Sequence, residues 1–505
     1  MSVASVYTIQ PSVLNGTIVT IEADISRGLH AFSIVGLAGK AVDESKDRVS
    51  SAIKHSDLQS PKTKNQKIVI SLSPADLKKE GPLFDLPIAI AYLIAAEELV
   101  VDDIRRAYVG ELGLDGTLRG VKGILNCVMA ARDAGFAEII VPKANAEEAA
   151  LITDINIFPA GTLREVLEHI KTDEPVKLSI QPTTTIEDGW YESAVTLEDI
   201  KGQETAKRGL IIAAAGRHNV MLVGPPGTGK TMLARALRGL LPPLSRTEAL
   251  AVTAIHSLAN DNVEISTRPP FRSPHHTASY TALVGGGSNP KPGEVTLAHH
   301  GVLFMDEFPE FDRRTLDALR QPLEDRFVTI SRVQGTAEFP ADFILVAALN
   351  PYRGSEDGTK NLLRAMQETY KNKVSGPILD RIDLWLEVPH VDYDTLTKLK
   401  QTTGETEEAR NQVKEARINM NKRGEAHKLS TTTNANLSAR EIEQSIQLSS
   451  EVKDLLKVSS SKLNLSPRSY HRLIKVARTI ADLENSENIE VPHVLEALQY
   501  RVPIQ

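Results

Sequence analysis

The clearest chemistry in this sequence lies in residues 224–231, GPPGTGKT, a glycine-rich stretch that ends in a lysine and a threonine. The apolar run NVMLV precedes it and MLARALRGL follows it, so we expect a strand, a loop and a helix in that order. In such a loop backbone N–H groups surround phosphates, Lys230 reaches the β- and γ-phosphates, and the Thr231 hydroxyl ligates Mg²⁺. The stretch therefore predicts a site for ATP and Mg²⁺. The expected ATP-binding residues are Gly224, Pro225, Pro226, Gly227, Thr228, Gly229, Lys230 and Thr231, with Gln203 upstream.

Two acidic residues and an asparagine end later apolar runs. GVLFMDEF, residues 301–308, predicts a buried strand that delivers Asp306 to the metal and Glu307 as the base that polarises the attacking water. FILVAALNP, residues 343–351, predicts another buried strand that ends in Asn350, placed to orient that water. The alternatives are an acidic turn after a core strand, and a turn asparagine before Pro351.

Two arginines complete the predicted catalytic set. Arg381 stands just before an expected strand in SGPILDRIDLWLEVP, and Arg468 stands at an expected helix start in LSPRSYHRLIKVAR. Either could form a surface salt bridge, which is the usual role of an arginine. As phosphate contacts they would supply the positive charge that phosphoryl transfer requires.

The elements that position these residues fall into four segments. Residues 1–170 predict a mixed α/β domain, with a half-buried strand in TIVTIEADIS, a hairpin about Asp115-Gly116, and the helix ILNCVMAARD before the strand EIIVP. Residues 171–195 lack a sustained period and predict a linker. Residues 196–392 predict a nucleotide-binding parallel α/β sheet, and residues 393–505 predict a polar helical domain.

The ordered motifs resemble those of an AAA+ ATPase, and FRSPHHTAS, LVGGG, KPGEVTLAHHGVLFMDE, LRQPLED and SGPILDRID resemble its magnesium-chelatase-like branch. With the N-terminal segment included, the chain resembles the ComM/YifB family over essentially its whole length. This resemblance implies an AAA+ core with pore-loop insertions, a helical lid with Arg468 as second sensor, and Arg381 as an arginine finger acting in trans. A finger in trans implies a closed homo-oligomeric ring, usually a hexamer. One departure is that NPYRGSEDGTKNLLRAM lacks the cysteines often found in the family after the sensor asparagine.

The N-terminal segment resembles the proteolytic domain of Lon, an α+β domain, in ISLSPADLKKEGPLFDLPIAIAYLIAA and in GELGLDGTLRGVKGILNCVMAARDAG. The Lon enzyme needs a serine nucleophile and a lysine that activates it. Spacing places Leu83 at the serine position and Leu125 at the lysine position. Lys122 lies nearby but has no hydroxyl partner at the matching place. We expect the fold to be kept and the peptidase chemistry to be lost.

Two insertions predict contacts with a threaded polymer. LVGGGSNPKPGE, residues 283–294, predicts an extended loop that interrupts a helix, and DRFVTISRVQGTAEFPADF, residues 325–343, predicts a hairpin before the sensor strand. In related rings both elements point into the central pore. Lys291, Arg326 and Arg332 would then contact a DNA backbone. The alternative is that these are solvated loop charges.

Paired histidines, His275-His276 and His299-His300, could suggest a metal site. Adjacent side chains rarely point the same way, and no acidic or cysteine partner has ligand spacing nearby. Structural hydrogen bonding near the nucleotide is the favoured interpretation.

Composition and charge limit the surface chemistry and the cellular compartment that we expect for this protein. The formal charge of −7 argues against a broadly basic surface, yet basic residues can gather on a few inward-facing loops. The single cysteine, Cys127, excludes a disulfide framework within one chain and fits a cytoplasmic protein. We expect no signal peptide, and the longest uncharged apolar run, residues 86–96, is about half of a membrane span.

Three functions remain open from the sequence. The resemblance to the ComM/YifB family implies a ring motor that acts on single-stranded, forked or branched DNA, in branch migration during recombination and natural transformation, where recombination proteins are possible partners. A magnesium-chelatase subunit is the second, although such subunits are expected to lack the Lon-like domain. A protein-remodelling ring is the third.

Overall fold

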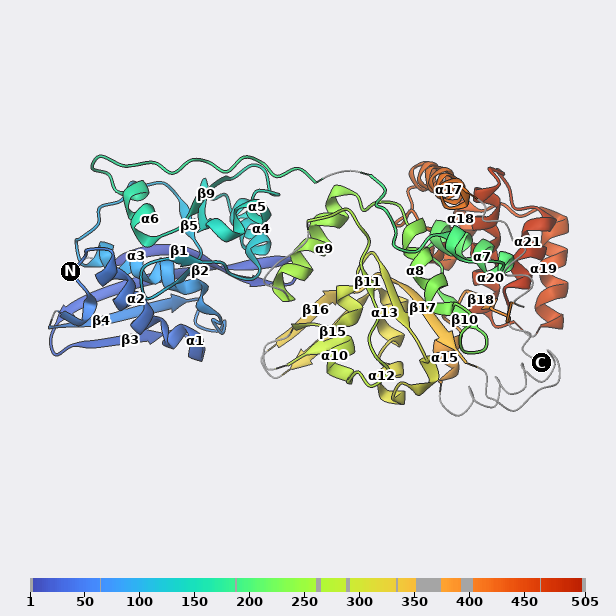
Figure 1. Ribbon diagram of the computed structural model, residues 1–505, viewed down its shortest axis with the longest axis horizontal. Helices are drawn as coiled ribbons and strands as arrows, with labels where there is room; N and C mark the ends of the chain where they lie inside the picture. The colour runs from blue at the N-terminus through green and yellow to red at the C-terminus, as the bar shows by residue number, and fades with distance from the viewer. Residues whose placement is uncertain are drawn as a thin grey trace. The chain divides into compact units, whose positions relative to one another are not determined.

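The computed structural model in Figure 1 describes residues 3–63, 65–186, 189–259, 265–287, 291–332, 335–350, 374–391, 403–463 and 465–501. The chain divides into an N-terminal unit, residues 1–187 with 246–266, and a C-terminal unit, residues 188–245 with 267–505. The predicted α/β composition and the helical C-terminus are both observed.

The N-terminal unit contains a seven-stranded sheet in the order β3-β4-β2-β1-β5-β8-β9. The β1–β2 and β2–β4 pairs are antiparallel and the other neighbours are parallel. The alternation predicted for TIVTIEADIS is confirmed in β2, because Val19, Ile21 and Ala23 are fully buried while Glu22 is exposed. The strands are β1 (Ala4–Ser12), β2 (Asn15–Arg27), β3 (Ala31–Val35), β4 (Gln66–Ser73), β5 (Arg106–Tyr108), β8 (Glu138–Pro142) and β9 (Asn156–Ala160).

Helices α3 and α4 both pack against β1 and β2 and close the core of this unit (Figure 1). The predicted hairpin is confirmed, because β6 (Glu111–Leu112) pairs with β7 (Leu118–Arg119) on either side of Asp115-Gly116. The predicted helix and strand at residues 124–142 correspond to α4 and β8. The helices before the linker are α1 (Lys40–Asp43), α2 (Ser45–His55), α3 (Asp85–Ala95), α4 (Ile124–Asp133), α5 (Ala146–Ala149) and α6 (Leu163–Ile170).

Helix α9 (Arg246–Ala259) joins the N-terminal unit, although the sequence analysis placed its residues in the ATPase core. It packs against α4, and Ala254 is fully buried in the N-terminal core. The Gly123 N–H donates to Ser257 O over 3.1 Å, and an Arg246 guanidinium N–H donates to Leu151 O over 3.2 Å. The order of residues along the chain does not specify which core an amphipathic helix joins, so tertiary packing decides its place.

The predicted linker is only partly separate from the N-terminal unit. Residues 175–186 contain neither helix nor strand, as the sequence predicts. They nevertheless bond to this unit, since the Gln181 N–H donates to Ile157 O and the Thr184 N–H donates to Ala150 O, each over 2.9 Å. The first part of the segment is therefore held on the N-terminal unit.

The C-terminal unit contains a five-stranded parallel sheet in the order β11-β14-β17-β10-β18. Two short antiparallel ladders, β12–β13 and β15–β16, occupy the two predicted insertions. The strands of the sheet are β10 (Val220–Val223), β11 (Phe271–Arg272), β14 (Val302–Met305), β17 (Ile344–Leu349) and β18 (Leu384–Glu387). The ladders comprise β12 (Gly285–Gly286), β13 (Lys291–Pro292), β15 (Phe327–Arg332) and β16 (Gly335–Pro340).

One group of helices packs near this sheet, and a second group, later in the chain, forms the C-terminal lid. The lid helices α17 and α20 both pack against α7, so lid and sheet share one hydrophobic core. Within the described ranges, no helix is long and apolar enough to cross a membrane. The helices near the sheet are α7 (Glu204–Gly216), α8 (Lys230–Leu240), α10 (Tyr280–Val284), α11 (Glu294–Leu297), α12 (Arg313–Asp317), α13 (Arg320–Asp325) and α15 (Gly376–Leu379). The lid comprises α17 (Glu405–His427), α18 (Ala439–Ser445), α19 (Ser450–Lys462), α20 (Pro467–Leu483) and α21 (Val491–Gln499).

Candidate functional site

Three neighbouring parallel strands bring the predicted catalytic residues, except the two arginines, to one edge of the C-terminal sheet. Strands β14, β17 and β10 are adjacent, and Val223 pairs with Leu349 while Met305 pairs with Ala347. Because parallel strands end at the same side of a sheet, the residues that follow them gather there. The phosphate loop, residues 224–231, follows β10, whereas Asp306 and Glu307 follow β14 and Asn350 follows β17. We call this side the carboxyl edge.

The backbone of the phosphate loop requires glycine for two different reasons. Gly229 has φ of 90°, a left-handed conformation that a side chain would strain. Gly224 lies so close to β18 that a Cβ would stand 2.1 Å from Val388 O. Helix α8 begins at Lys230, so its first N–H groups and its dipole face the loop. The loop is built to accept an anion.

Lys230 is held inside this loop. Its ammonium donates to Gly224 O over 2.8 Å and to Pro225 O over 2.7 Å. Burial lowers the pKa of Lys230, and the nearby carboxylate of Asp306 opposes that shift. Neutral carbonyls are weaker partners for an ammonium than phosphate oxygens, so a bound triphosphate can replace them.

Glu307, the predicted base, has a histidine partner. Oε2 of Glu307 lies 3.1 Å from Nδ1 of His276, and its side chain is 47% exposed. The Glu307 N–H donates to Asp306 Oδ1 over 2.9 Å, which fixes the two acidic residues relative to each other. Nδ1 of His275 instead lies 2.9 Å from Thr277 Oγ1. The predicted hydrogen bonding is observed for His275, and His276 makes its contact with the candidate base itself.

Two buried oxygens at the carboxyl edge have no hydrogen-bond partner among the described residues, Asn350 Oδ1 and Gln203 Oε1. The Gln203 amide donates to Pro389 O over 2.7 Å, which places it beyond the end of β18. Free acceptors of this kind fit a ligand or its water. The described part of the chain holds no group of three His, Cys, Asp or Glu residues that could bind a metal alone. Asp306 and Thr231 nevertheless suit Mg²⁺, which usually takes one or two protein ligands together with substrate phosphates.

Arg381 and Arg468 lie at the end of the sheet where the strands begin, whereas the phosphate loop lies at the end where they finish. Arg381 precedes β18, whose first residue, Leu384, pairs with Val220 at the start of β10. Both guanidinium groups donate to one carboxylate, Arg381 to Oε2 and Arg468 to Oε1 of Glu324. We call the side formed by the residues before β10, β17 and β18 the amino edge. The structure therefore brings the two arginines together but separates them from their own phosphate loop.

No pattern in the sequence predicts a role for Glu324. Its only sequence signal is its place in LRQPLED, a motif that carried the family resemblance.

The second histidine pair and Arg326 also belong to the amino edge. The Asp342 N–H donates to Nδ1 of His299 over 3.0 Å, and burial, with His300 nearby, lowers the pKa of His299 to about 3. Arg326 donates to Phe343 O over 3.2 Å and lies 3.4 Å from an Asp342 oxygen. The guanidinium of Arg326 is turned inward to these groups, and its contact with DNA stays a prediction.

The other expected DNA contacts lie on the two ladders. Lys291 is exposed on β13, and Arg332 pairs with Gly335 at the last described rung of β15–β16. The predicted hairpin is confirmed. The cysteine-free segment NPYRGSEDGTKNLLRAM after Leu349, beyond its first residue, lies outside the described residues, as does the predicted domain boundary at residue 393.

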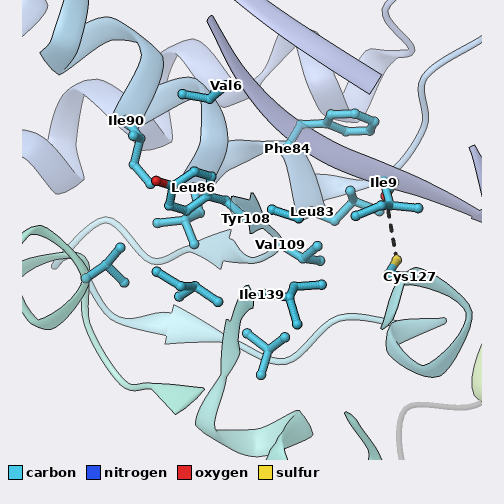
Figure 2. Packing of buried hydrophobic residues seen from close by; sticks show 14 of the residues in the cluster. Val6, Ile9, Leu83, Phe84, Leu86, Ile90, Tyr108, Val109, Cys127 and Ile139 are labelled. Atoms are coloured by element: carbon cyan, nitrogen blue, oxygen red, sulfur yellow. Dashed lines mark hydrogen bonds between the residues drawn. The ribbon is translucent and has the colours of Figure 1, made fainter. Parts of the chain in front are cut away.

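Leu83 and Leu125, at the predicted positions of the Lon dyad, are both buried in the apolar core of the N-terminal unit. Figure 2 shows Leu83 beside Val109 and Ile9, whose carbonyl O lies 3.6 Å from Cys127 Sγ. The Lys122 ammonium donates to Ala259 O over 3.5 Å. No polar group of a dyad stands at either leucine position.

Comparison with known families covers most of the chain. Residues 196–396 match the model described as magnesium chelatase, subunit ChlI, and residues 403–501 match the model of its C-terminal part. Residues 21–145 match a model described as subunit ChlI of Mg-chelatase. This last match covers the segment that magnesium-chelatase subunits are expected to lack, although the model is named for such a subunit.

Curated relatives match over the whole length. The chain is 43% identical to Competence protein ComM of Haemophilus influenzae, across 100% of this chain and 98% of the relative. It is 44% identical to the uncharacterized protein YifB of Escherichia coli, across 99% of this chain and 97% of that protein. The Magnesium-chelatase 67 kDa subunit of Heliobacterium mobile is 28% identical over 43% of this chain and 38% of its own length. Together with the parallel sheet and the helical lid, these matches establish that the chain belongs to the ComM/YifB family of magnesium-chelatase-like AAA+ proteins.

Proposed function

We propose that this protein hydrolyses ATP with Mg²⁺ at the carboxyl edge and uses the energy to move DNA strands. The observation that carries the hydrolysis step is the gathering of the phosphate loop, Asp306, Glu307 and Asn350 at the ends of three adjacent strands. This set supplies phosphate binding, metal binding, a base and a group that orients water.

Each residue has a distinct part in the proposed reaction. Lys230 leaves the loop carbonyls and binds the β- and γ-phosphates, while Thr231 and Asp306 hold Mg²⁺, which neutralises charge that develops on the phosphates. Glu307 takes the proton of the attacking water, and Asn350 orients that water through its unpartnered Oδ1. Gln203 Oε1 accepts a hydrogen bond from the nucleotide.

The active site is shared between two copies of the chain. Arg381 and Arg468 lie at the amino edge, and the four residues of β10 alone span about 13 Å at roughly 3.3 Å per residue. Neither arginine stabilises the transition state at its own phosphate loop in this arrangement. A ring in which the amino edge of one copy faces the carboxyl edge of the next completes every site.

DNA is the proposed substrate of the motor. The full-length relative named Competence protein ComM supports a role in DNA uptake or recombination. Lys291 and Arg332 on the two ladders are the proposed contacts, and a ring would gather several copies of each around a phosphate backbone. We assign branch migration as the specific activity.

A metal-insertion subunit is the second candidate, because all three matching family models are named for magnesium chelatase. The two functions differ in what stimulates hydrolysis. ATP turnover by the assembled protein should rise with four-way-junction or forked DNA and stay at its basal rate with porphyrin and Mg²⁺. If protein shown to be oligomeric neither binds DNA at low salt nor hydrolyses ATP faster with DNA, the proposal of a DNA motor is wrong. If only a polypeptide stimulates ATP hydrolysis, the protein is a protein remodeller.

A further inference from the structure

Arg381 and Arg468 converge on one side chain although they are 87 positions apart in the sequence. Each takes a different oxygen of Glu324, which stands near the end of α13. The Arg381 side chain is 7% exposed, whereas those of Arg468 and Glu324 are 57% and 46% exposed. The carboxylate of Glu324 and the guanidinium of Arg468 therefore lie at the surface, whereas Arg381 is buried.

The bridge forms one wall of a cationic cavity of about 470 Å³. The cations that line the cavity are Arg326, Arg381, Arg468, Arg472 and Lys475, against the two carboxylates Glu324 and Asp383. Asp383 is already satisfied: burial would raise its pKa, but Arg472, at 3.3 Å, and His218 hold it well below its usual range. Arg326 has Asp342 as its acidic partner, and Glu324 is the acidic residue that pairs with Arg381 and Arg468.

Two further observations indicate that this cavity suits an anion. Burial, with Arg472 and Arg326, lowers the pKa of Lys475 to about 8 against the opposing effect of Asp383. Nε of Arg381 is buried and has no hydrogen-bond partner among the described residues. A carboxylate between two guanidinium groups is also the nearest protein counterpart of a phosphate oxygen pair.

We propose that Glu324 is an internal counterion that occupies the place of a nucleotide phosphate held by a second copy of this chain. The inference rests on the proposed shared ATP site. When the carboxyl edge of the neighbour presents its triphosphate, Arg381 and Arg468 exchange the Glu324 carboxylate for phosphate oxygens. Glu324 thereby sets how readily the arginines join the site: they stay bound to Glu324 in a lone chain and are released on assembly around ATP.

The exchange predicts a specific effect of removing the charge of Glu324. In Glu324→Gln the neutral amide competes less well for the arginines, so the neighbour's phosphate meets less opposition. The protein concentration that gives half-maximal ATP hydrolysis should fall about tenfold, which corresponds to about 1.4 kcal/mol. Glu324 is 46% exposed, and the amide oxygen of the glutamine can still accept a hydrogen bond from an arginine.

A titration of hydrolysis against protein concentration tests this effect. The matched control is Glu451→Gln, the same change at an exposed position of α19. Glu324→Gln combined with Arg381→Ala should lose the gain. The proposal is overturned if the protein concentration for half-maximal hydrolysis by Glu324→Gln equals that of Glu451→Gln or is higher. Glu324 would then have no effect on assembly, or would be needed to position the arginines.

A second measurement does not depend on ATP hydrolysis. Lys230→Ala disables the phosphate loop, so inorganic phosphate can report on the cavity alone. Phosphate should raise the melting temperature of Lys230→Ala/Glu324→Gln more than that of Lys230→Ala, and adding Arg381→Ala should abolish the difference. Equal phosphate effects in the first two proteins overturn the proposal. If the wild-type chain hydrolyses no ATP at any concentration, the proposed function fails, and the phosphate measurement still decides the role of Glu324.

Discussion

Nδ1 of His276 lies 3.1 Å from Oε2 of Glu307, so the candidate base enters the reaction with its carboxylate already oriented by an imidazole. His276 follows β11 and Glu307 follows β14, and these strands are parallel neighbours. The contact therefore follows from the sheet order, and it predicts that His276 is a positioning residue rather than a catalytic one.

The first prediction separates the base from its partner. Glu307→Gln should bind ATP but hydrolyse it at least about 100-fold more slowly, since it removes the proton acceptor. His276→Ala should lower kcat by roughly 10-fold with little change in ATP affinity, because only the orientation of the carboxylate is lost.

His275→Ala is the matched control, because His275 contacts Thr277 and not Glu307. ATP turnover and equilibrium nucleotide binding measure the two effects. If His276→Ala and His275→Ala hydrolyse ATP equally fast, the positioning role is lost, and equal rates for Glu307→Gln and wild type would exclude Glu307 as the base.

The phosphate loop, Asp306, Glu307 and Asn350 could be predicted from sequence because each follows a short apolar run, a local signal. Lys230, Asp306 and Asn350 gather once the strands pair in parallel. The arrangement at the amino edge could not be predicted from sequence, because Glu324 contacts Arg381 and Arg468 only through tertiary folding. Helix α9 shows the same limit: its apolar face is visible in the sequence, but the core that it joins is not. The contact of Arg326 with Asp342 could not be predicted either, because the place of Arg326 beside a predicted hairpin does not reveal it.

The second prediction concerns the shared site. Arg381→Ala should reduce turnover by roughly 10³-fold, the low end for an arginine finger, while Lys230→Ala should largely abolish ATP binding. Because the defects lie on opposite edges of the sheet, mixing the two variants should restore part of the activity. The measurement is ATP turnover of each variant and of the mixture. Absence of any recovery in rings shown to contain both variants would argue for a site within one chain.

The third prediction is a pH effect on the stability of the C-terminal unit. The folded pKa of His299 is lowered to about 3, and its Nδ1 accepts the Asp342 N–H, so the ring stays neutral when folded. The unfolded chain takes up this proton below an ordinary pKa of about 6.5. As pH falls from about 6.5 towards 3, the free energy of unfolding should therefore fall by up to about 1.4 kcal/mol per pH unit from this residue.

His299→Asn keeps an acceptor for the Asp342 N–H but cannot take up a proton. Its free energy of unfolding should fall less steeply with acid than that of wild type, and His275→Asn should behave as wild type. Urea unfolding followed by tryptophan fluorescence reports on this unit, since Trp190 and Trp385 both belong to it. Parallel curves for wild type and His299→Asn would contradict the assignment.

The fourth prediction is that residues 1–170 have no peptidase activity. Leu83 and Leu125 fill the predicted dyad positions with buried apolar side chains, which can neither attack a peptide bond nor activate a nucleophile. Unfolded casein incubated with the protein, ATP and Mg²⁺ should remain intact on a gel. Cleavage that disappears when a serine of this domain is changed to alanine would contradict this prediction.

The last prediction tests the proposed DNA contacts by their salt dependence. Each phosphate that a lysine or arginine neutralises releases counterions, so the logarithm of the binding constant falls with the logarithm of salt concentration, by about 0.7 per contact on single strands. Lys291→Ala and Arg332→Ala should each flatten that slope and reduce the ratio of DNA-stimulated to basal ATP hydrolysis.

Arg326→Ala is the informative comparison, because Arg326 faces Asp342 and Phe343 O rather than solvent. It should lower stability without flattening the salt slope, since no phosphate contact is removed. Fluorescence anisotropy of labelled single-stranded DNA at several salt concentrations measures the slope, and urea unfolding measures stability. A slope that is unchanged in Lys291→Ala and Arg332→Ala but reduced in Arg326→Ala would move the DNA path from the two ladders to the amino edge.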